Sequence, residues 1–205
     1  MKLLLATHNK NKVIELMALL NDHPEIEVLT LSDLNITEEP EETESTFAGN
    51  AALKAQWAAE RSGLLSMADD SGLEIDALNK EPGVYSARYL GKDTPYDLKN
   101  DIILKRLADT KNRSARFISV VAIAYPQSDD SGLANTDIIL CEGIMEGSIA
   151  YQQKGSNGFG YDPIFVPLGF DETYAEMKTA DKNKVSHRGQ AFRKAVKVLI
   201  QGEIV

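Results

Sequence analysis

Short apolar runs alternate with longer amphipathic stretches along the first third of the chain. The run at residues 2–6 predicts a strand, and apolar residues at helical spacing predict a helix over about 11–20. A second apolar run at 26–31 predicts another strand, and an Ala-rich stretch predicts a helix over 46–62 that ends at Gly63. This strand–helix–strand order is typical of α/β proteins with a partly parallel sheet.

The remaining sequence continues the alternation. It predicts strands at 64–68, 73–76, 115–125 and 136–145, helices at 95–108 and 189–200, an exposed hairpin loop at 127–135 and a Gly-rich loop at 155–160. We therefore expect an α/β fold with a mixed, partly parallel sheet flanked by helices.

The segment Asp69-Asp70-Ser71-Gly72 follows the apolar run 64–68 directly. Two adjacent acids at the end of a buried strand are costly unless a cation or hydrogen-bond donors receive them. Strand ends in open α/β sheets are also where ligands tend to bind. A plain acidic turn in solvent is the alternative, and this segment alone does not decide between the two.

Composition narrows the classes of function. The 205 residues carry a net charge of −9, which argues against a broad basic face for nucleic-acid polymers but allows a small anionic ligand. The only cysteine, Cys141, lies in an apolar run and fits a buried thiol. The apolar part of the N-terminus is short for a signal peptide and no stretch has membrane-spanning length, so we expect a cytoplasmic enzyme.

Three segments carry candidate phosphate and metal chemistry. Thr7–Lys12 joins the first strand to the first helix, where a helix N-terminus binds anions; an ordinary helix cap is the alternative. Glu41 and Glu42 lie in an acidic loop and could complete an oxygen shell for Mg²⁺ with Asp70; a solvated loop is the alternative. Lys54 could reach a phosphate if its helix packs against the site, although a lone helical lysine usually faces solvent.

A basic cluster precedes the last predicted helix. It contains Lys182, Lys184, His187 and Arg188 in an otherwise acidic chain. Cations at the start of a helix are unfavourable, so their presence there hints at a ligand.

Taken together, these segments resemble the inosine triphosphate pyrophosphatase family. The matching pieces, in order, are Thr7–Lys12 with Glu15, Glu41-Glu42-Thr43, Thr46-Phe47, Asn50-Ala51, Lys54, the run 68–73, Pro82–Arg88, Gly158–Phe165 and Ser186–Ala191. One piece alone would be weak evidence, whereas the ordered set covers nearly the whole chain.

The resemblance implies a single two-lobed domain over residues 1–205, with an elongated mixed sheet and a nucleotide cleft between the lobes. It implies a homodimer and Mg²⁺-dependent hydrolysis of ITP, dITP and XTP to the monophosphate and pyrophosphate. It gives no role for a nucleic-acid polymer or a membrane.

The same resemblance implies residue roles. Asp70 is expected to be the metal-linked general base, and Glu41 is expected in the metal site. Asp69 is expected to support that pair, and Ser71 is expected to touch the substrate. Phosphates are expected at Thr7, His8, Asn9, Lys10, Asn11, Lys12 and Lys54. The base and sugar are expected at Phe159, Gly160, Tyr161 and Asp162, and the purine edge at Lys182, His187 and Arg188.

Three positions depart from the family pattern. Glu44 stands where the family often has Gly, Gly49 where it often has Glu, and Asn157 where Gly is common. The exchange at Gly49 leaves the number of acids near the metal open. Three other functions also stay open: hydrolysis of damaged pyrimidine nucleotides, nucleotide binding without turnover, and removal of the γ-phosphate alone.

Overall fold

The computed structural model describes residues 1–21, 23–126 and 138–201, and the predicted hairpin loop at 127–135 lies outside them. The chain forms two compact units. Unit 1 comprises Met1–Asp70, Ser119–Gly143 and Gly189–Val205, and unit 2 comprises Ser71–Ile118 and Ile144–Arg188. The chain passes from one unit to the other four times, within the strands β3 (Ser66–Ile75), β4 (Ser114–Ala124) and β5 (Ile139–Ile149) and at the start of the helix α5 (His187–Gln201).

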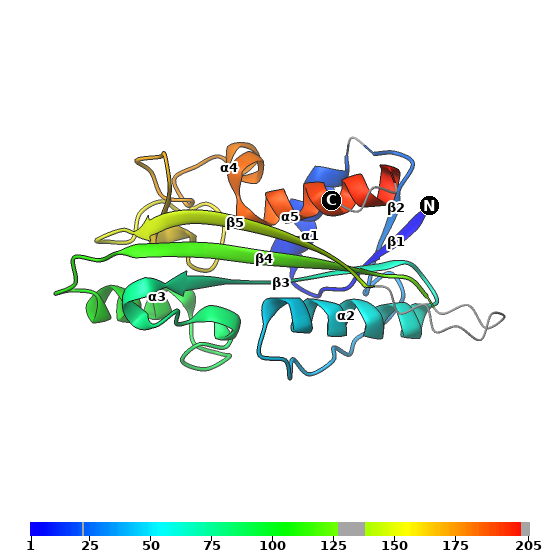
Figure 1. The fold of residues 1–205 in the computed structure, drawn as a ribbon, viewed down its shortest axis with the longest axis horizontal. Coiled ribbons are helices and arrows are strands. Elements are labelled where there is room, and N and C mark those ends of the chain that lie inside the picture. The colour runs from blue at the N-terminus through cyan, green and yellow to red at the C-terminus, as the bar shows by residue number, and fades with distance from the viewer. Residues whose placement is uncertain (22, 127–137, 202–205) are drawn as a thin grey trace. The chain divides into compact units, whose positions relative to one another are not determined.

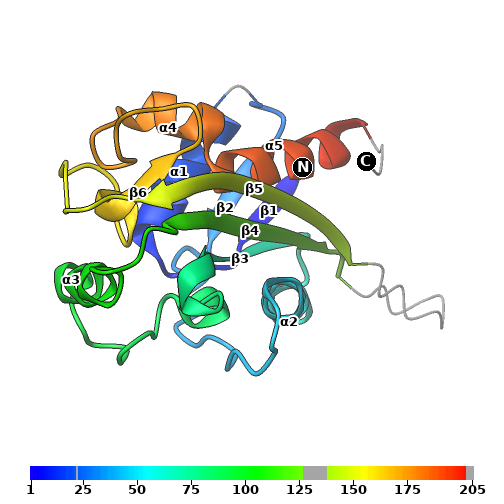
Figure 2. The ribbon, with the colours of Figure 1, turned by 60° about the vertical axis from the view of Figure 1, so that its left-hand side comes forward.

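Unit 1 begins with β1 (Lys2–Leu5), which pairs in parallel with β2 (Glu27–Thr30) and with β3. Helices α1 (Lys10–Leu20) and α5 (His187–Gln201) lie on one face of these strands, and α2 (Phe47–Ser62) lies on the other (Figure 2). Leucines of β1 and α1 pack with Phe192 and Val196 of α5 in one apolar core. The parallel pairing confirms the strand–helix–strand prediction.

Capping residues fix the start of α1 and both ends of α2 in unit 1. Asn9 caps α1 by accepting the backbone N–H groups of Asn11 and Lys12. Thr46 caps α2 through the N–H of Gly49, and Gly63 ends that helix in the left-handed region with φ of 67°. The expected bounds of α2 are confirmed because these local signals dominate there.

The strand β3 corrects the prediction for the acidic segment. The sequence predicted two short strands, 64–68 and 73–76, with the acids at the end of the first strand and a turn in solvent as the alternative, but Ser66–Ile75 forms one continuous ten-residue strand. Asp69 and Asp70 therefore lie inside the strand. The ladder with β1 stops at Leu5↔Met67, so both acids extend past the carboxyl end of β1.

Unit 2 contains α3 (Tyr96–Arg106), β6 (Phe165–Pro167) and α4 (Thr179–Val185), together with short 3₁₀ helices at Asp76–Leu78, Gly83–Tyr85 and Asp162–Ile164. Its core is aromatic: Phe117 packs edge-on against Phe165, with ring centroids 4.7 Å apart, and stacks on Tyr174 at 5.8 Å. Both β6 and α4 are too short to leave a clear periodic pattern, and the sequence did not predict them.

The strand order is β2-β1-β3-β4-β5-β6, with β5 and β6 antiparallel. Figure 1 shows β3, β4 and β5 side by side. The predicted α/β class with a mixed sheet is confirmed. The nucleotide cleft stays a prediction. Among the described residues, no helix combines the length and apolar character needed to cross a membrane.

Candidate functional site

The segment from Thr7 to Lys12 leaves the carboxyl end of β1 and enters α1. The side chain of Asn9 holds the N–H groups of Asn11 and Lys12 at 3.0 and 3.3 Å, and Thr7 Oγ1 accepts the N–H of Asn9 at 3.2 Å. The predicted alternative of an ordinary cap is confirmed for Asn9. A cap of this kind also presents Lys10 and Asn11 at an exposed turn, and their predicted phosphate contacts stay predictions.

His8 faces the acidic loop that precedes α2. Its backbone N–H donates to Glu39 Oε1 at 3.2 Å, and its ring Nε2 lies 3.4 Å from the carbonyl oxygen of Glu38. These contacts tie the first turn of the Thr7–Lys12 segment to the loop.

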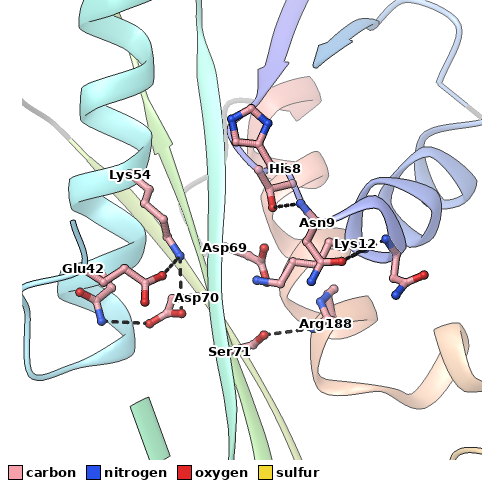
Figure 3. Close-up of polar contacts among 12 residues, drawn as sticks. His8, Asn9, Lys12, Glu42, Lys54, Asp69, Asp70, Ser71 and Arg188 are labelled. Atoms are coloured by element: carbon pink, nitrogen blue, oxygen red, sulfur yellow. Dashed lines mark hydrogen bonds and ion pairs between the residues drawn. The ribbon is translucent and has the colours of Figure 1, made fainter. Parts of the chain in front are cut away.

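Asp69 and Asp70 point to opposite faces of β3, as successive strand residues must. Asp69 Oδ2 lies 2.8 Å from Lys12 Nζ of α1. Asp70 Oδ1 lies 3.5 Å from Lys54 Nζ of α2. Figure 3 shows Lys12 and Lys54 on the two sides of the strand. One lysine from α1 and one from α2 therefore offset the free-energy cost of burying the two carboxylates.

Lys54 also contacts the acidic loop: its Nζ lies 2.8 Å from Glu42 Oε1. Glu42, Lys54, Asp70 and the fully buried Asn50 form what we call the Asp70 group, in which Asn50 Nδ2 donates to Asp70 Oδ2 at 3.2 Å. The structure places Glu42 in this group, whereas the side chain of Glu41 is exposed. The metal role predicted for Glu41 stays a prediction.

Burial and charge act in opposite directions on the Asp70 group. Burial raises the pKa of the Asp70 carboxyl, while Lys54 and Lys12 partly counter that rise. Burial alone would lower the pKa of Lys54, but the carboxylates of Asp70, Asp69 and Glu42 raise it above its ordinary value. The raised pKa keeps the Lys54 ammonium positively charged, and the neighbouring Asp70 carboxyl has a greater proton affinity than usual. That combination suits a general base near a polyanion.

The oxygen donors of the Asp70 group fit a magnesium ion. Nowhere in residues 1–21, 23–126 and 138–201 do three or more His, Cys, Asp or Glu side chains gather as a complete metal cluster. Asp70 and Glu42 nevertheless both approach one cation, the Lys54 ammonium. Mg²⁺ commonly takes one or two protein carboxylates and completes its shell with water and substrate phosphates. Two hard-oxygen ligands are sufficient for such a site.

The two departures at 44 and 49 meet in the structure. A Cβ added at Gly49 would lie only 2.8 Å from Glu44 Cβ and 2.9 Å from its Cγ. The Glu44 side chain therefore packs over the first turn of α2 in the space that a larger residue at 49 would need. The exchange of residue types at these two positions is sterically linked.

In unit 2, cations gather around the ring of Phe159. The guanidinium of Arg188 lies 5.2 Å from the ring centroid, and its Nη2 donates to Ser71 Oγ at 3.0 Å. Lys182 Nζ lies 5.3 Å from the same centroid and 2.6 Å from Asp162 Oδ2. We call these five residues the Arg188 group.

The loop that carries Phe159 is held by its own backbone and by Asp162. Asp162 Oδ2 also accepts the N–H of Phe159 at 2.8 Å. Gly158 has φ of 73°, and a Cβ there would lie 2.0 Å from that carboxylate oxygen, so only glycine fits. Asn157, the third departure, donates its side-chain amide to the carbonyl of Met177 at 2.9 Å, which anchors the loop without glycine at that position.

Tyr161 and Gly160 are engaged within unit 2. The Tyr161 hydroxyl donates to the carbonyl of Ser86 at 2.8 Å, and burial raises its pKa strongly. The Gly160 carbonyl accepts from Asn100 Nδ2 at 3.2 Å. The structure thus gives Tyr161 a supporting position under the loop, while its predicted contact with the base or sugar stays a prediction.

His187 is buried at the start of α5, with its ring stacked on Phe117 at 4.5 Å between centroids. The His187 ring also stacks on Tyr174, with centroids 6.3 Å apart. The sequence did not predict either contact, because Phe117 and Tyr174 occupy ordinary apolar positions. Asn50 was named among the pieces that match the family but was given no role, although one signal existed: a lone amide on the otherwise apolar buried face of α2.

Comparison with known proteins gives consistent results. The sequence profile of the Ham1 family matches residues 3–198. A protein of Flavobacterium johnsoniae named dITP/XTP pyrophosphatase is 43% identical over 199 residues, covering 97% of this chain and 98% of that protein. A protein of Coxiella burnetii with the same name is 41% identical over the full length of both chains.

Solved structures agree with this result. A HAM1 protein from Coxiella burnetii has a TM-score of 0.85 at 39% identity and covers 98% of this chain and 99% of its own. The Ham1 protein of Staphylococcus aureus has a TM-score of 0.84 at 34% identity, with the same coverage.

Proposed function

The chain belongs to the Ham1 family, and from this premise we propose that it is a hydrolase that cleaves dITP, XTP and ITP to the nucleoside monophosphate and pyrophosphate. The observation that carries the proposal is the Asp70 group. A buried carboxylate, a second carboxylate and a firmly charged lysine lie together just past the carboxyl end of a parallel strand. Relatives named dITP/XTP pyrophosphatase support the substrate class.

Hydrolysis at the α-phosphorus needs an in-line water and neutralisation of the charge that develops on the phosphates. Asp70 orients the water and takes its proton, a role that its raised proton affinity favours. Lys12 and Lys54 bind the departing pyrophosphate, exchanging their present contacts with Asp69 and Glu42 for phosphate oxygens. Pyrophosphate is a stable leaving group, so the reaction needs no covalent intermediate.

Asp70 and a glutamate of the acidic loop would hold Mg²⁺. When bound, the ion would lower the pKa of water and neutralise phosphate oxygens. Glu42 has the better position for this role because it already shares the Lys54 ammonium with Asp70.

The Arg188 group selects the base. Hypoxanthine and xanthine present an oxygen acceptor at position 6, where adenine presents an amino donor. A guanidinium such as that of Arg188 would face adenine donor to donor. A buried donor left without a partner costs about 1–3 kcal/mol, enough for useful discrimination against ATP.

We further propose that the enzyme works as a homodimer in the cytoplasm. The family resemblance supports the dimer, and the location follows from a substrate drawn from the free nucleotide pool. Light scattering coupled to size-exclusion chromatography measures the dimer directly.

The proposal is tested by incubating the protein with ITP, XTP, dITP, ATP and GTP, with Mg²⁺ or with a chelator, and identifying the products. We expect IMP and pyrophosphate from ITP, little reaction of ATP and GTP, and no reaction in chelator. Orthophosphate in place of pyrophosphate would mean γ-phosphate removal. Tight binding of ITP without turnover would mean a nucleotide sensor, and turnover only of modified pyrimidine nucleotides would change the substrate class.

A further inference from the structure

Asn50 uses both ends of its side-chain amide. Its Oδ1 accepts the backbone N–H of Glu44 at 3.1 Å, and its Nδ2 donates to Asp70 Oδ2 at 3.2 Å. The partners fix the orientation of the amide. The reverse orientation would set its oxygen against a carboxylate oxygen and its NH₂ against an N–H group.

The location of Asn50 is unfavourable for a merely structural residue. It is fully buried on a helix face whose other buried residues are apolar: Phe47, Ala51, Ala55, Ala58 and Ala59. Asparagine is a poorer helix former than alanine, and burying an amide costs free energy that its hydrogen bonds must offset. An apolar residue of similar size would suit the core better, so the reason for the amide lies in its two partners.

The contacts of Asn50 close a ring within unit 1. Asp70 Oδ1 faces Lys54, Lys54 bonds to Glu42, and Glu42 lies two residues from Glu44 on the same loop. Asn50 therefore holds one oxygen of Asp70 and leaves the other toward Lys54. Through the Glu44 N–H it also anchors the loop that brings Glu42 there (Figure 3 shows Glu42, Lys54 and Asp70).

We propose that Asn50 is a positioning residue for the hydrolysis: it orients the Asp70 carboxylate and fixes the acidic loop beside it. This inference rests on the proposed function, because it assigns Asn50 a part in the chemistry proposed for Asp70. Gly49 belongs to the same arrangement, since only a residue without Cβ lets Glu44 approach α2 so closely.

The first test compares Asn50→Ala and Asn50→Asp with the wild type, using dITP. Asn50→Asp keeps the size and the acceptor for the Glu44 N–H, but it replaces the donor to Asp70 with a second acceptor. Residues that support active-site ligands in this way are worth about 10–100-fold in activity. We expect kcat to fall by roughly that factor in both variants, with KM and the preference for dITP over dATP unchanged.

Gln56→Ala is the matched control. Gln56 is an amide on the same helix, and its side chain bonds to Glu60 rather than to the Asp70 group. We expect wild-type kcat and KM for this variant. Thermal melting and circular dichroism establish that each variant is folded.

A second test leaves Asn50 and Asp70 untouched. Gly49→Ala would push Glu44 away from α2 and weaken its N–H bond to Asn50, although alanine is the better helix former. We expect a lower kcat. Adding Glu44→Gly removes the clashing side chain and keeps the backbone N–H, so the double variant should recover activity.

The outcomes separate two failures. If the wild type releases no pyrophosphate from any nucleotide, the proposed function fails and the role of Asn50 falls with it. If the wild type is active and folded Asn50 variants keep its kcat, only the positioning role is wrong. Loss of folding in both Asn50 variants, or failure of Glu44→Gly to restore Gly49→Ala, would also overturn it, because a structural role would then suffice.

Discussion

The Asp70 group of unit 1 and the Arg188 group of unit 2 handle charge differently. In the Asp70 group, one lysine, Lys54, contacts two carboxylates, those of Asp70 and Glu42. In the Arg188 group, the guanidinium of Arg188 and the ammonium of Lys182 both lie near the ring of Phe159, and the carboxylate of Asp162 pairs with Lys182. A lysine that can leave its carboxylates for phosphate oxygens suits the cleavage of a phosphate bond. Cations beside an aromatic ring suit the recognition of a flat base.

The largest effect should separate the two adjacent acids of β3. We expect Asp70→Asn to lower kcat by about 10²–10⁴-fold, the range for losing a general base. Asp69→Asn is the matched variant, since it changes the same group on the opposite face, where it contacts Lys12. Steady-state kinetics with dITP measure both, and an equal loss in the two variants would refute the division of roles along the strand.

The next effect is on stability and belongs to unit 2. Asp162→Ala removes the carboxylate from its ion pair with Lys182, in which both side chains are only 4% exposed. Breaking a buried pair costs about 3–5 kcal/mol, and here the N–H of Phe159 also loses its acceptor. Denaturant unfolding measures the change.

Asp181→Ala is its control, because Asp181 forms an exposed pair with Lys184 in the same region. We expect the free energy of unfolding to stay close to that of the wild type. A similar loss in both variants would mean that burial of the Lys182 pair contributes nothing special.

A smaller effect concerns the pH dependence of unit 1. Lys54 opposes the rise that burial causes in the pKa of Asp70, so Lys54→Ala should raise that pKa further. A general base works only when deprotonated, so activity falls below its pKa and the acidic limb should move to higher pH. The pH profile of kcat measures this, with Lys105→Ala, an exposed lysine of α3, as control. If the acidic limb of the pH profile stays at the same pH in Lys54→Ala, then Lys54 does not affect the titration of Asp70 and the prediction is wrong.

The sequence predicted local features better than contacts between distant segments. The bounds of α2 followed from Thr46 and Gly63, which act on neighbouring backbone groups. The sequence predicted a break between two short strands at the acidic segment, but a lysine from a helix on either face of β3 allows the strand to continue. Tertiary pairing overrode local preference there.

In the candidate site, too, the sequence did not predict contacts between segments that are far apart in the chain. Asp70 and Lys54 were predicted and the structure brings them together, whereas Asn50 was overlooked as a site residue. The choice between Glu41 and Glu42 depends on which way the loop turns, and no local pattern encodes that. The stack of His187 on Phe117 joins residues 70 positions apart, and neither carries a signal for the other.

The most direct test asks whether the Asp70 group serves cleavage and the Arg188 group serves base selection. It measures the ratio of kcat/KM for dITP to kcat/KM for dATP in the wild type, Lys54→Ala and Arg188→Ala. We expect Lys54→Ala to lower both values of kcat/KM by the same factor and to leave their ratio unchanged. Arg188→Ala should reduce the ratio by about 5–150-fold, which corresponds to the 1–3 kcal/mol of an unpaired donor. A ratio that survives in Arg188→Ala, or collapses in Lys54→Ala, would contradict this division of roles.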